Sequence, residues 1–532
     1  MVIKRFGSAD ADLANIRPRF TLALFLVLTA ALSSCARTAV PAAPERLAEG
    51  PKQGVYYEVF VRSFADSDGD GAGDFNGLTG KLDYLSDLGV TGLWLMPCFA
   101  SPSYHGYDIS DYYGVHPDYG TMDDFETFIQ EAGKRGISVI LDLVINHTSA
   151  QHPWFQASKD PDSPYRDWYH WSEDGEGVNL NATAFGGNRV WNNAGSGYYA
   201  ALFWDQMPDL NFDSPELRRE IEKIAKFWLD KGVAGFRLDA AMHLYSSQET
   251  RTGGKSPGEL NLAYWAEFAD YCRSVKPGCY LVGEIWDSPG TRAPYAAPLD
   301  SVFHFDMGEA LARAIVNGSS KGNAFINSMR MEYDRLASVN PDAINAIFLS
   351  NHDQNRICTA LRNDRDNLKM AASVYLTMQG LPFVYYGEEL GMLGGKPDEY
   401  IRTPFLWGGD DPALCTWIES PHNKNTVPFM EQNADPDSLL SLYRRVMNLR
   451  IATPALFDGV LEPAEQPNDA VLSYTMTAPG QTVLVLHNLS VETQTVDLNG
   501  SGRVLFVTAK EGFSAGGTSV ILPPKCSAVI EL

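Results

Sequence analysis

Apolar runs recur along the chain from residue 54 onward, and most of them are rich in β-branched and aromatic side chains. They begin at Gly54, Thr91, Ile137, Gly235, Tyr280, Ser301, Asn345 and Pro382. A short, continuous apolar run is typical of a strand that is buried on both faces of a parallel sheet. The pattern therefore predicts eight strands of one buried sheet.

Helical patterns lie between most of these runs. They start near Leu78, Met122, Asp213, Asn261, Asn323, Asn367 and Ser438. Asp213 and Glu216 stand at the spacing of a capping box, and Gly232 ends the same helical pattern. Alternation of strands and helices predicts an α/β fold, a (β/α)8 TIM barrel. An open doubly wound sheet would need a glycine-rich phosphate loop after an early strand, and we find none.

Two stretches interrupt the alternation. Residues 148–208 follow the third strand and are aromatic, rich in Asn and Gly, and without a clear period. So long a connection is usually functional, so we expect an inserted domain B there, between barrel segments 51–147 and 209–453. From 454 to 532 the pattern changes to short alternating strands, which predict a C-terminal antiparallel β-sandwich.

The first 35 residues predict an export signal. Basic residues precede an apolar run from Phe20 to Leu32, which is too short to cross a bilayer comfortably. The run ends in LSSC, which resembles a bacterial lipobox with Cys35 as the lipidated residue; an ordinary signal peptide cut near Ala36 to Ala39 is the alternative. Residues 36–50 then form a flexible linker. We expect an exported protein that is held at the bacterial cell envelope only through this lipid.

Composition narrows the classes of partner. The chain has 532 residues, is 45% hydrophobic and carries a formal net charge of -24. Such a charge repels nucleic acid and anionic membrane surfaces, whereas it suits a neutral polyol substrate or bound cations. The six cysteines after Cys35 are scattered without a CxxC pair, which argues against a zinc site. Cys272 and Cys279 could pair, but their spacing does not require it.

Polar side chains stand at the ends of several predicted strands, where the active sites of such barrels form. They are Asp142, Asn146, His147, Arg237, Asp239, Glu284, His352 and Asp353. Acids that converge in an apolar setting should perturb one another's pKa values. Arg237 shares a strand face with Asp239 and would keep it ionised. An ionised carboxylate beside one that holds a proton suits glycoside hydrolysis.

Six stretches resemble the α-amylase family of glycoside hydrolases, in the family's order. They read DLVINH from Asp142, MPDLN from Met207, GFRLDAAMH from Gly235, GEIW from Gly283, SNHDQNR from Ser350 and GLPFVYYGEELGM from Gly380. The resemblance covers roughly residues 51 to 530. The MPDLN stretch resembles a group between oligo-1,6-glucosidases and neopullulanases, which includes bacterial lipoprotein α-amylases.

The resemblance implies a role for each matching residue. Asp239 matches the nucleophile, Glu284 the general acid/base, and Asp353 the third acid that grips sugar hydroxyls. Substrate-binding positions of the family match Tyr107, Asp108, His147, Arg237, His243, His352, Asp398 and Arg402. His243 could equally be a structural histidine, and Asp142 is expected to support the site. The family retains the anomeric configuration, so the carboxyl groups of Asp239 and Glu284 should lie about 5–5.5 Å apart.

The residue after the predicted nucleophile bears on specificity. It is Ala240, where α-1,6-specific relatives commonly carry Val, so we expect an α-amylase that cleaves α-1,4 bonds inside starch-like glucans or maltooligosaccharides. We also expect the protein to be a monomer. An exo-acting α-glucosidase or oligo-1,6-glucosidase stays open, because Asp108 stands where exo-enzymes use an acid. A 4-α-glucanotransferase would share every catalytic residue. A non-catalytic relative would be expected to lose one of the three acids, and all three are present.

An acidic loop, DSDGDGAGDF, runs from Asp66 to Phe75. Positions 1, 3, 5, 7 and 9 of an EF-hand-type loop match Asp66, Asp68, Asp70, Ala72 (through its carbonyl) and Asp74. Gly77 replaces the glutamate at position 12, and a strand precedes the loop, so a full EF-hand is excluded. A solvated turn is the alternative, although four uncompensated carboxylates repel one another. Relatives in the α-amylase family carry a similar loop that holds Ca²⁺, so we predict a structural Ca²⁺ here.

Overall fold

The structure is a computed structural model that describes residues 47–48, 50–246, 254–409, 411–465, 467–498 and 502–532. The expected signal peptide, Cys35 and most of the expected linker lie outside these residues. Within the described ranges, no helix combines the length and the apolar character that crossing a bilayer requires.

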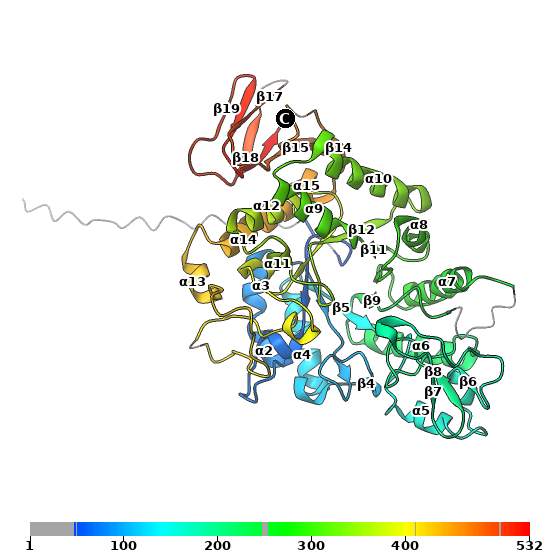
Figure 1. Ribbon diagram of the computed structural model, residues 1–532. Coiled ribbons are helices and arrows are strands. Elements are labelled where there is room, and N and C mark those ends of the chain that lie inside the picture. Colours follow the sequence, from blue (N-terminus) through cyan, green and yellow to red (C-terminus); the bar gives the residue numbers. More distant parts are fainter. Residues whose placement is uncertain (1–46, 49, 247–253, 410, 466, 499–501) are drawn as a thin grey trace, which may run out of the picture. The chain divides into compact units, whose positions relative to one another are not determined.

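Eight parallel strands close into a barrel (Figure 1). They are β1 (Tyr56–Val59), β2 (Gly92–Leu95), β5 (Ser138–Leu143), β9 (Gly235–Leu238), β10 (Tyr280–Gly283), β11 (Ser301–Phe303), β12 (Ile344–Phe348) and β13 (Leu381–Tyr385). Their order around the barrel is β1-β13-β12-β11-β10-β9-β5-β2. Each strand lies in one of the eight apolar runs, apart from the first residue of β12 and of β13, so the predicted TIM barrel is confirmed.

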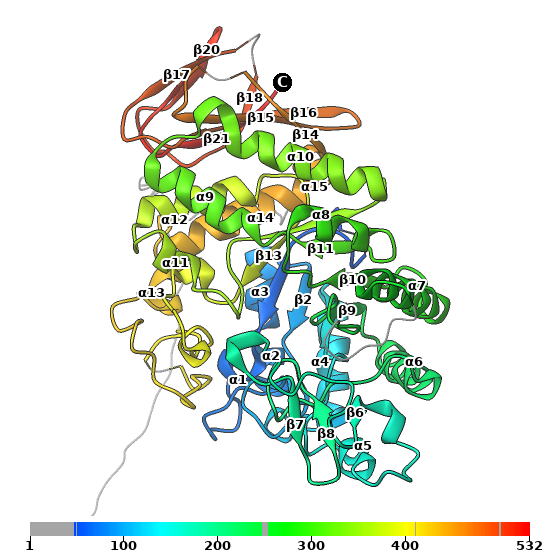
Figure 2. The ribbon, with the colours of Figure 1, turned by 45° about the vertical axis from the view of Figure 1, so that its right-hand side comes forward.

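Helices surround the strands (Figure 2). The longer ones are α3 (Leu82–Leu88), α4 (Met122–Lys134), α6 (Pro215–Asp230), α7 (Pro257–Val275), α9 (Asp306–Asn317), α10 (Ala324–Val339), α12 (Arg365–Tyr375) and α14 (Leu439–Ala452). The pattern near Leu78 divides into α2 (Phe75–Gly80) and α3. Helix α9 has no counterpart among the sequence predictions.

The start of α6 corrects one prediction. Ser214, and not Asp213, is the N-cap: its Oγ accepts a hydrogen bond from the Leu217 backbone N–H at 3.3 Å. Pro215 then occupies the first helical position, where its missing N–H costs nothing. Helix α7 likewise begins before the predicted Asn261, behind a capping box of Ser256 and Glu259.

The barrel interior is filled by large side chains. Tyr56, Trp94, Tyr280, Phe303 and Phe383 belong to one buried cluster with residues from other barrel strands. The rings of Tyr56 and Phe383 stack with centroids 4.9 Å apart. Because the interior is packed, a substrate can be received only at an end of the barrel.

Residues between β5 and α6 form a small substructure of their own. It contains α5 (Pro153–Ser158) and a three-stranded sheet of β6 (Trp171–Ser172), β8 (Tyr198–Ala200) and β7 (Trp191–Asn193). A separate apolar cluster that includes Val190, Trp191 and Leu202 stabilises it. A second small sheet, β3 (Phe99–Ala100) with β4 (Asp111–Val115), follows β2 and has no counterpart among the sequence predictions.

The C-terminal region is antiparallel, as predicted. A five-stranded sheet contains β14 (Val460–Pro463), β15 (Val471–Ala478), β16 (Gln481–Asn488), β21 (Ser527–Glu531) and β18 (Arg503–Val507), in that order. A three-stranded sheet contains β17 (Gln494–Asp497), β20 (Ser519–Leu522) and β19 (Ser514–Gly516). Side chains of both sheets, such as Leu486 and Val520, share one apolar cluster.

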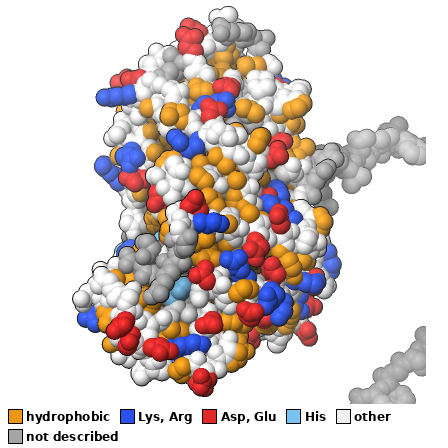
Figure 3. Space-filling view, turned by 90° about the vertical axis from the view of Figure 1, so that its right-hand side faces the viewer, with side chains coloured by type: hydrophobic (Ala, Val, Ile, Leu, Met, Phe, Trp, Pro, Cys, Tyr) orange, Lys and Arg blue, Asp and Glu red, His pale blue; other side chains and the backbone are white. Residues whose placement is uncertain are grey.

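On the face shown in Figure 3, basic and acidic side chains are interspersed, and no basic patch dominates that view. The cysteines of the described residues are free and buried, including Cys272 and Cys279. They contribute to packing and not to a covalent framework.

Candidate active site

Arg237 is the common partner of three acids at the carboxyl end of the barrel. It lies in β9, is 1% exposed, and its Nη1 is 2.7 Å from Asp142 Oδ1 and in contact with Asp239 Oδ1. Its Nη2 is 2.9 Å from Glu284 Oε2. Asp142 lies in β5, and Glu284 follows β10 directly. Three neighbouring strands thus bring Asp239 and Glu284, the predicted nucleophile and acid/base, onto one guanidinium.

The two carboxylates on Arg237 have different settings. Burial raises the pKa of Glu284 to about 7, and the charges of Asp239 and Asp353 act in the same direction against Arg237. Glu284 therefore holds a proton over much of the neutral range. Asp239 contacts the arginine that shields its charge. Glu284 is thus set to donate a proton, whereas Asp239 lies against a cation.

The backbone after Asp239 is held in an unusual conformation. Ala240 has a φ of 45°, in the left-handed region that non-glycine residues seldom adopt. Its N–H donates a hydrogen bond to Glu284 Oε2 at 2.9 Å. The strained peptide is one of the features that fix the orientation of Glu284 relative to Asp239.

The third acid, Asp353, lies on the loop after β12 and forms a second group with His352 and Arg402. Asp353 Oδ2 is 3.1 Å from His352 Nε2, and its Oδ1 is 2.9 Å from Arg402 Nη2. Burial would raise the pKa of Asp353, but His352 and Arg402 outweigh it and hold that pKa well below its usual range. Asp353 is therefore ionised at every pH at which the protein is expected to work.

Tyr107 joins the two groups. Its hydroxyl donates to Asp142 Oδ2 at 3.0 Å, and its oxygen also contacts His352 Nε2. The ring lies parallel to that of His352, with centroids 5.5 Å apart. A continuous set of contacts thus runs from Glu284 through Arg237, Asp142 and Tyr107 to the third acid, as convergence at one mouth requires.

The other predicted substrate-binding residues lie around these groups. His147 is buried, its Nδ1 lies 3.3 Å from the side-chain nitrogen of Asn146, and burial lowers its pKa. The ring of His243 lies 5.3 Å from that of Phe185 and contributes to a cavity with it. Asp398 pairs with Lys396 and lies 3.5 Å from Arg402 Nη2.

Asp108 is placed differently from the rest. It is 2% exposed, and its Oδ1 accepts hydrogen bonds from the hydroxyls of Ser101, at 2.8 Å, and Ser103. Its carboxylate therefore supports its own loop. His105 lies 3.9 Å away through Nδ1.

Sequence reasoning missed two kinds of residue near the site. Glu58 of β1 is buried and contacts His352 Nδ1; its signal was a single acid inside an apolar run. Exposed aromatic rings also went unassigned. Trp286, two residues after Glu284, is 53% exposed and stacks on Phe305 with centroids 4.7 Å apart.

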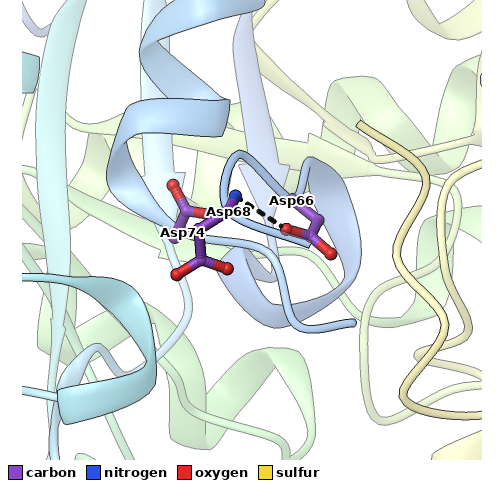
Figure 4. A group of neighbouring side chains, drawn as sticks. All are labelled: Asp66, Asp68 and Asp74. Atoms are coloured by element: carbon purple, nitrogen blue, oxygen red, sulfur yellow. Dashed lines mark hydrogen bonds between the residues drawn. The ribbon is translucent and has the colours of Figure 1, made fainter. Parts of the chain in front are cut away.

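The acidic loop brings three of its four acids together (Figure 4). Carboxylate oxygens of Asp66, Asp68 and Asp74 all lie within 4.8 Å of one another, whereas Asp70 is not part of this group. Such a set of hard oxygen ligands suits Ca²⁺, which binds oxygens at about 2.3–2.6 Å. Asp74 also caps α2 by accepting the Gly77 N–H at 2.8 Å. Ala72 is buried beside this group, and its N–H donates to Asp70 at 2.7 Å.

Comparison with known proteins agrees with this geometry. The catalytic domain of α-amylases matches residues 58–459, and the C-terminal domain of the α-amylase SusG matches residues 471–529. The protein named Alpha-amylase 3 of Dictyoglomus thermophilum is 42% identical over 486 residues, which covers 90% of this chain and 93% of that protein. An oligo-1,6-glucosidase of Parageobacillus thermoglucosidasius is 30% identical over 83% of this chain and 91% of that protein.

Solved structures give the same picture. The crystal structure of an α-amylase from H. orenii superposes with a TM-score of 0.83 at 39% sequence identity, over 90% of this chain and 99% of that one. The matches extend from the first barrel strand to the last C-terminal sheet and include every strand end that carries a site residue. The chain therefore belongs to the α-amylase family of glycoside hydrolases.

Proposed function

We propose that the chain is a retaining α-amylase that hydrolyses internal α-1,4 bonds of starch-like glucans and maltooligosaccharides. The observation that carries the proposal is the shared guanidinium of Arg237, which holds Asp239 and Glu284 at one point. Two carboxyl groups, one ionised and one protonated, are what a double displacement at an anomeric carbon needs.

In the first half of the reaction, Asp239 attacks the anomeric carbon and forms a glycosyl ester. The bond from that carbon to the glycosidic oxygen breaks, and Glu284 gives its proton to the departing oxygen. Charge that develops on the sugar is stabilised by nearby carboxylates, among them Asp353. The raised pKa of Glu284, about 7, keeps the required proton in place.

In the second half, Glu284 acts as a base. It takes a proton from a water molecule, whose oxygen attacks the same carbon and displaces Asp239. The products are a sugar with its original anomeric configuration and an enzyme in its starting protonation state. His147 and Asp353, two of the predicted sugar-contacting residues, would bind hydroxyls of the reacting sugar.

Two observations support action inside a glucan chain. Asp108 is 2% exposed and its Oδ1 accepts hydrogen bonds from two serine hydroxyls, so it offers little surface to a chain end. Exposed aromatic rings adjoin the site at several points: Trp286, Phe185 beside His243, and Trp204, whose ring lies 6.5 Å from that of His105. Exposed rings of this kind offer flat apolar faces to successive sugars.

Product analysis on soluble starch, maltoheptaose and isomaltose tests the proposal. We expect a rapid loss of iodine staining with a mixture of short maltooligosaccharides, and no turnover of isomaltose. Glucose as the only early product would favour an exo-acting α-glucosidase. Products longer than the substrate would favour a 4-α-glucanotransferase.

A structural Ca²⁺ and a lipid anchor complete the proposal. Asp66, Asp68 and Asp74 would hold the cation, which would supply positive charge to a loop that has none of its own. The loop adjoins α2, so its role is to shape the first βα connection.

Export with lipidation at Cys35 is tested by mass spectrometry of the mature N-terminus. A diacylglyceryl-modified Cys35 is expected, and an unmodified residue between Ala36 and Ala39 would contradict it.

A further inference from the structure

Glu58 is a buried acid that no step of the proposed reaction uses. It lies in β1, its side chain is 2% exposed, and its Oε1 contacts Nδ1 of His352. Within the described chain, the ion pair with His352 is the only one found for Glu58. A carboxylate taken out of water is costly unless a cation compensates it.

The two ring nitrogens of His352 both face oxygen acceptors. Nδ1 faces Glu58, while Nε2 faces Asp353 Oδ2 at 3.1 Å and the oxygen of Tyr107. The hydroxyl proton of Tyr107 is directed to Asp142, so its oxygen is left to accept. A neutral imidazole has only one N–H, so it can satisfy only one of these sides.

We propose that Glu58 is a positioning residue that keeps His352 doubly protonated, so that His352 presents a cationic N–H to Asp353 and to the sugar bound beside it. The inference rests on the proposed glycosidase function and deepens it. Protonated His352 would be a third permanent cation at the carboxyl end of the barrel, besides Arg237 and Arg402. Five acids lie there: Glu58, Asp142, Asp239, Glu284 and Asp353.

Acids on three neighbouring elements favour the protonated state of His352. β1 contributes Glu58, β5 contributes Asp142 through Tyr107, and the loop of His352 itself contributes Asp353. The edge of Trp94 from β2 packs on the ring at 5.5 Å. Arg402 opposes the charge, but its Nε is bonded to the His352 carbonyl at 3.0 Å and its Nη2 to Asp353. Burial alone would lower the pKa of His352, yet Asp353 and Glu58 raise it to about 10.

A protonated His352 has a chemical consequence. A cationic donor binds a sugar hydroxyl or a developing charge more strongly than a neutral one. It also holds Asp353 ionised, because the imidazolium lies against that carboxylate. If Glu58 were a neutral amide, a neutral imidazole could accept a hydrogen bond at Nδ1, and the ring would lose its charge within the neutral pH range.

The protonation state can be measured directly in the wild-type protein. With ¹⁵N-labelled histidine, and with the signals of His352 identified by their loss in His352→Gln, both ring nitrogens should show imidazolium shifts at about pH 8, where an unperturbed histidine is neutral. A neutral His352 at that pH overturns the proposal. This measurement needs no activity, so it decides the question even if the variants below do not fold.

Kinetics then test the role of Glu58. The ratio of kcat/KM of Glu58→Gln to that of the wild type cancels the shared titration of Glu284. We expect the ratio to stay within about threefold of one at about pH 5 and to fall about 100-fold by about pH 8, the scale of losing one stabilising donor. Glu58→Asp, which keeps the charge, should restore a ratio that does not change with pH.

Glu389→Gln is the matched control. Glu389 is also fully buried, and its Oε1 accepts from the hydroxyls of Tyr57 and Tyr84, away from His352. The ratio of kcat/KM of Glu389→Gln to that of the wild type should not vary with pH. A ratio for Glu58→Gln that is equally independent of pH would refute the positioning role. An inactive wild type would instead refute the proposed function, while the histidine titration would still decide the state of His352.

Discussion

Two regions of this molecule gather carboxylates, and they compensate the charge in different ways. At the barrel mouth, Asp239, Glu284 and Asp353 contact arginines from the chain itself, Arg237 and Arg402. In the loop from Asp66 to Asp74, none of the four acids pairs with a lysine, arginine or histidine of the described residues. Their oxygens accept backbone N–H groups instead, as Asp66 Oδ2 accepts that of Gly71 at 2.8 Å.

The difference separates catalysis from scaffolding. A built-in cation lets an acid stay buried and leaves its charge available to a substrate, because no outside ion occupies the space in front of it. In the acidic loop, the proposed Ca²⁺ would supply the positive charge that the described residues do not provide there. The two acidic clusters should therefore behave differently in experiments. Substitution of the acids at the end of the barrel should abolish turnover, whereas loss of the proposed cation from the loop should lower stability.

The largest expected effect is at the mouth. Asp239→Asn removes the nucleophile but keeps its shape, so kcat on maltoheptaose should fall at least about 10⁴-fold with little change in melting temperature. Asp123→Asn, an exposed acid in the first turn of α4, should leave kcat unchanged. Substantial turnover by pure Asp239→Asn protein would remove Asp239 from the proposed mechanism.

Glu284→Gln should give the next largest effect, a loss of about 10³-fold, in the range of general acid catalysis. The pH profile sharpens the assignment. Glu284 must be protonated to act as the acid, so wild-type kcat/KM should decline as pH rises through about 7, the raised pKa of this group. The residual activity of the variant should lack that decline. A wild-type profile that stays flat to about pH 9 contradicts the role of Glu284.

The eight strands could be predicted from the sequence because each is a short run of mostly apolar residues, which is typical of burial on both faces. The helix starts were harder. Asp213 and Ser214 are both good N-caps, and only the position of Pro215 in the first turn decides between them. Helix α9 escaped prediction because it begins without a side-chain cap.

For the site, the sequence provided the residues at strand ends but not their pairing. Arg237 was expected to serve Asp239; its contacts with Asp142 and Glu284 depend on the order β5-β9-β10 around the barrel, which a linear pattern does not contain. Asp108 was predicted to bind substrate; the sequence did not show that its Oδ1 also accepts hydrogen bonds from the hydroxyls of Ser101 and Ser103. Glu58 depends on a histidine 294 positions away in the chain.

Removing the cation should affect the other region and produce a smaller change. EDTA should lower the melting temperature by several degrees, because an ion that binds only the folded state stabilises it by mass action. Turnover measured well below the melting temperature should change little. The control is Asp66→Asn, whose melting temperature should already be low and should no longer respond to EDTA. An EDTA-treated wild type that melts unchanged, with no calcium found in the purified protein, would contradict the site.

The smallest effect distinguishes two acids within the loop. From position alone, Asp68 and Asp70 are equivalent ligands, whereas the structure groups Asp68 with Asp66 and Asp74 and leaves Asp70 outside. Asp68→Asn should therefore weaken calcium binding by about tenfold, since one of three charged ligands becomes neutral. Asp70→Asn should weaken it by less than about threefold. Isothermal titration of both calcium-free variants measures the difference. Equal losses would mean that Asp70 moves into the coordination sphere when the ion binds, and that the loop is shaped by its cation instead of being formed in advance.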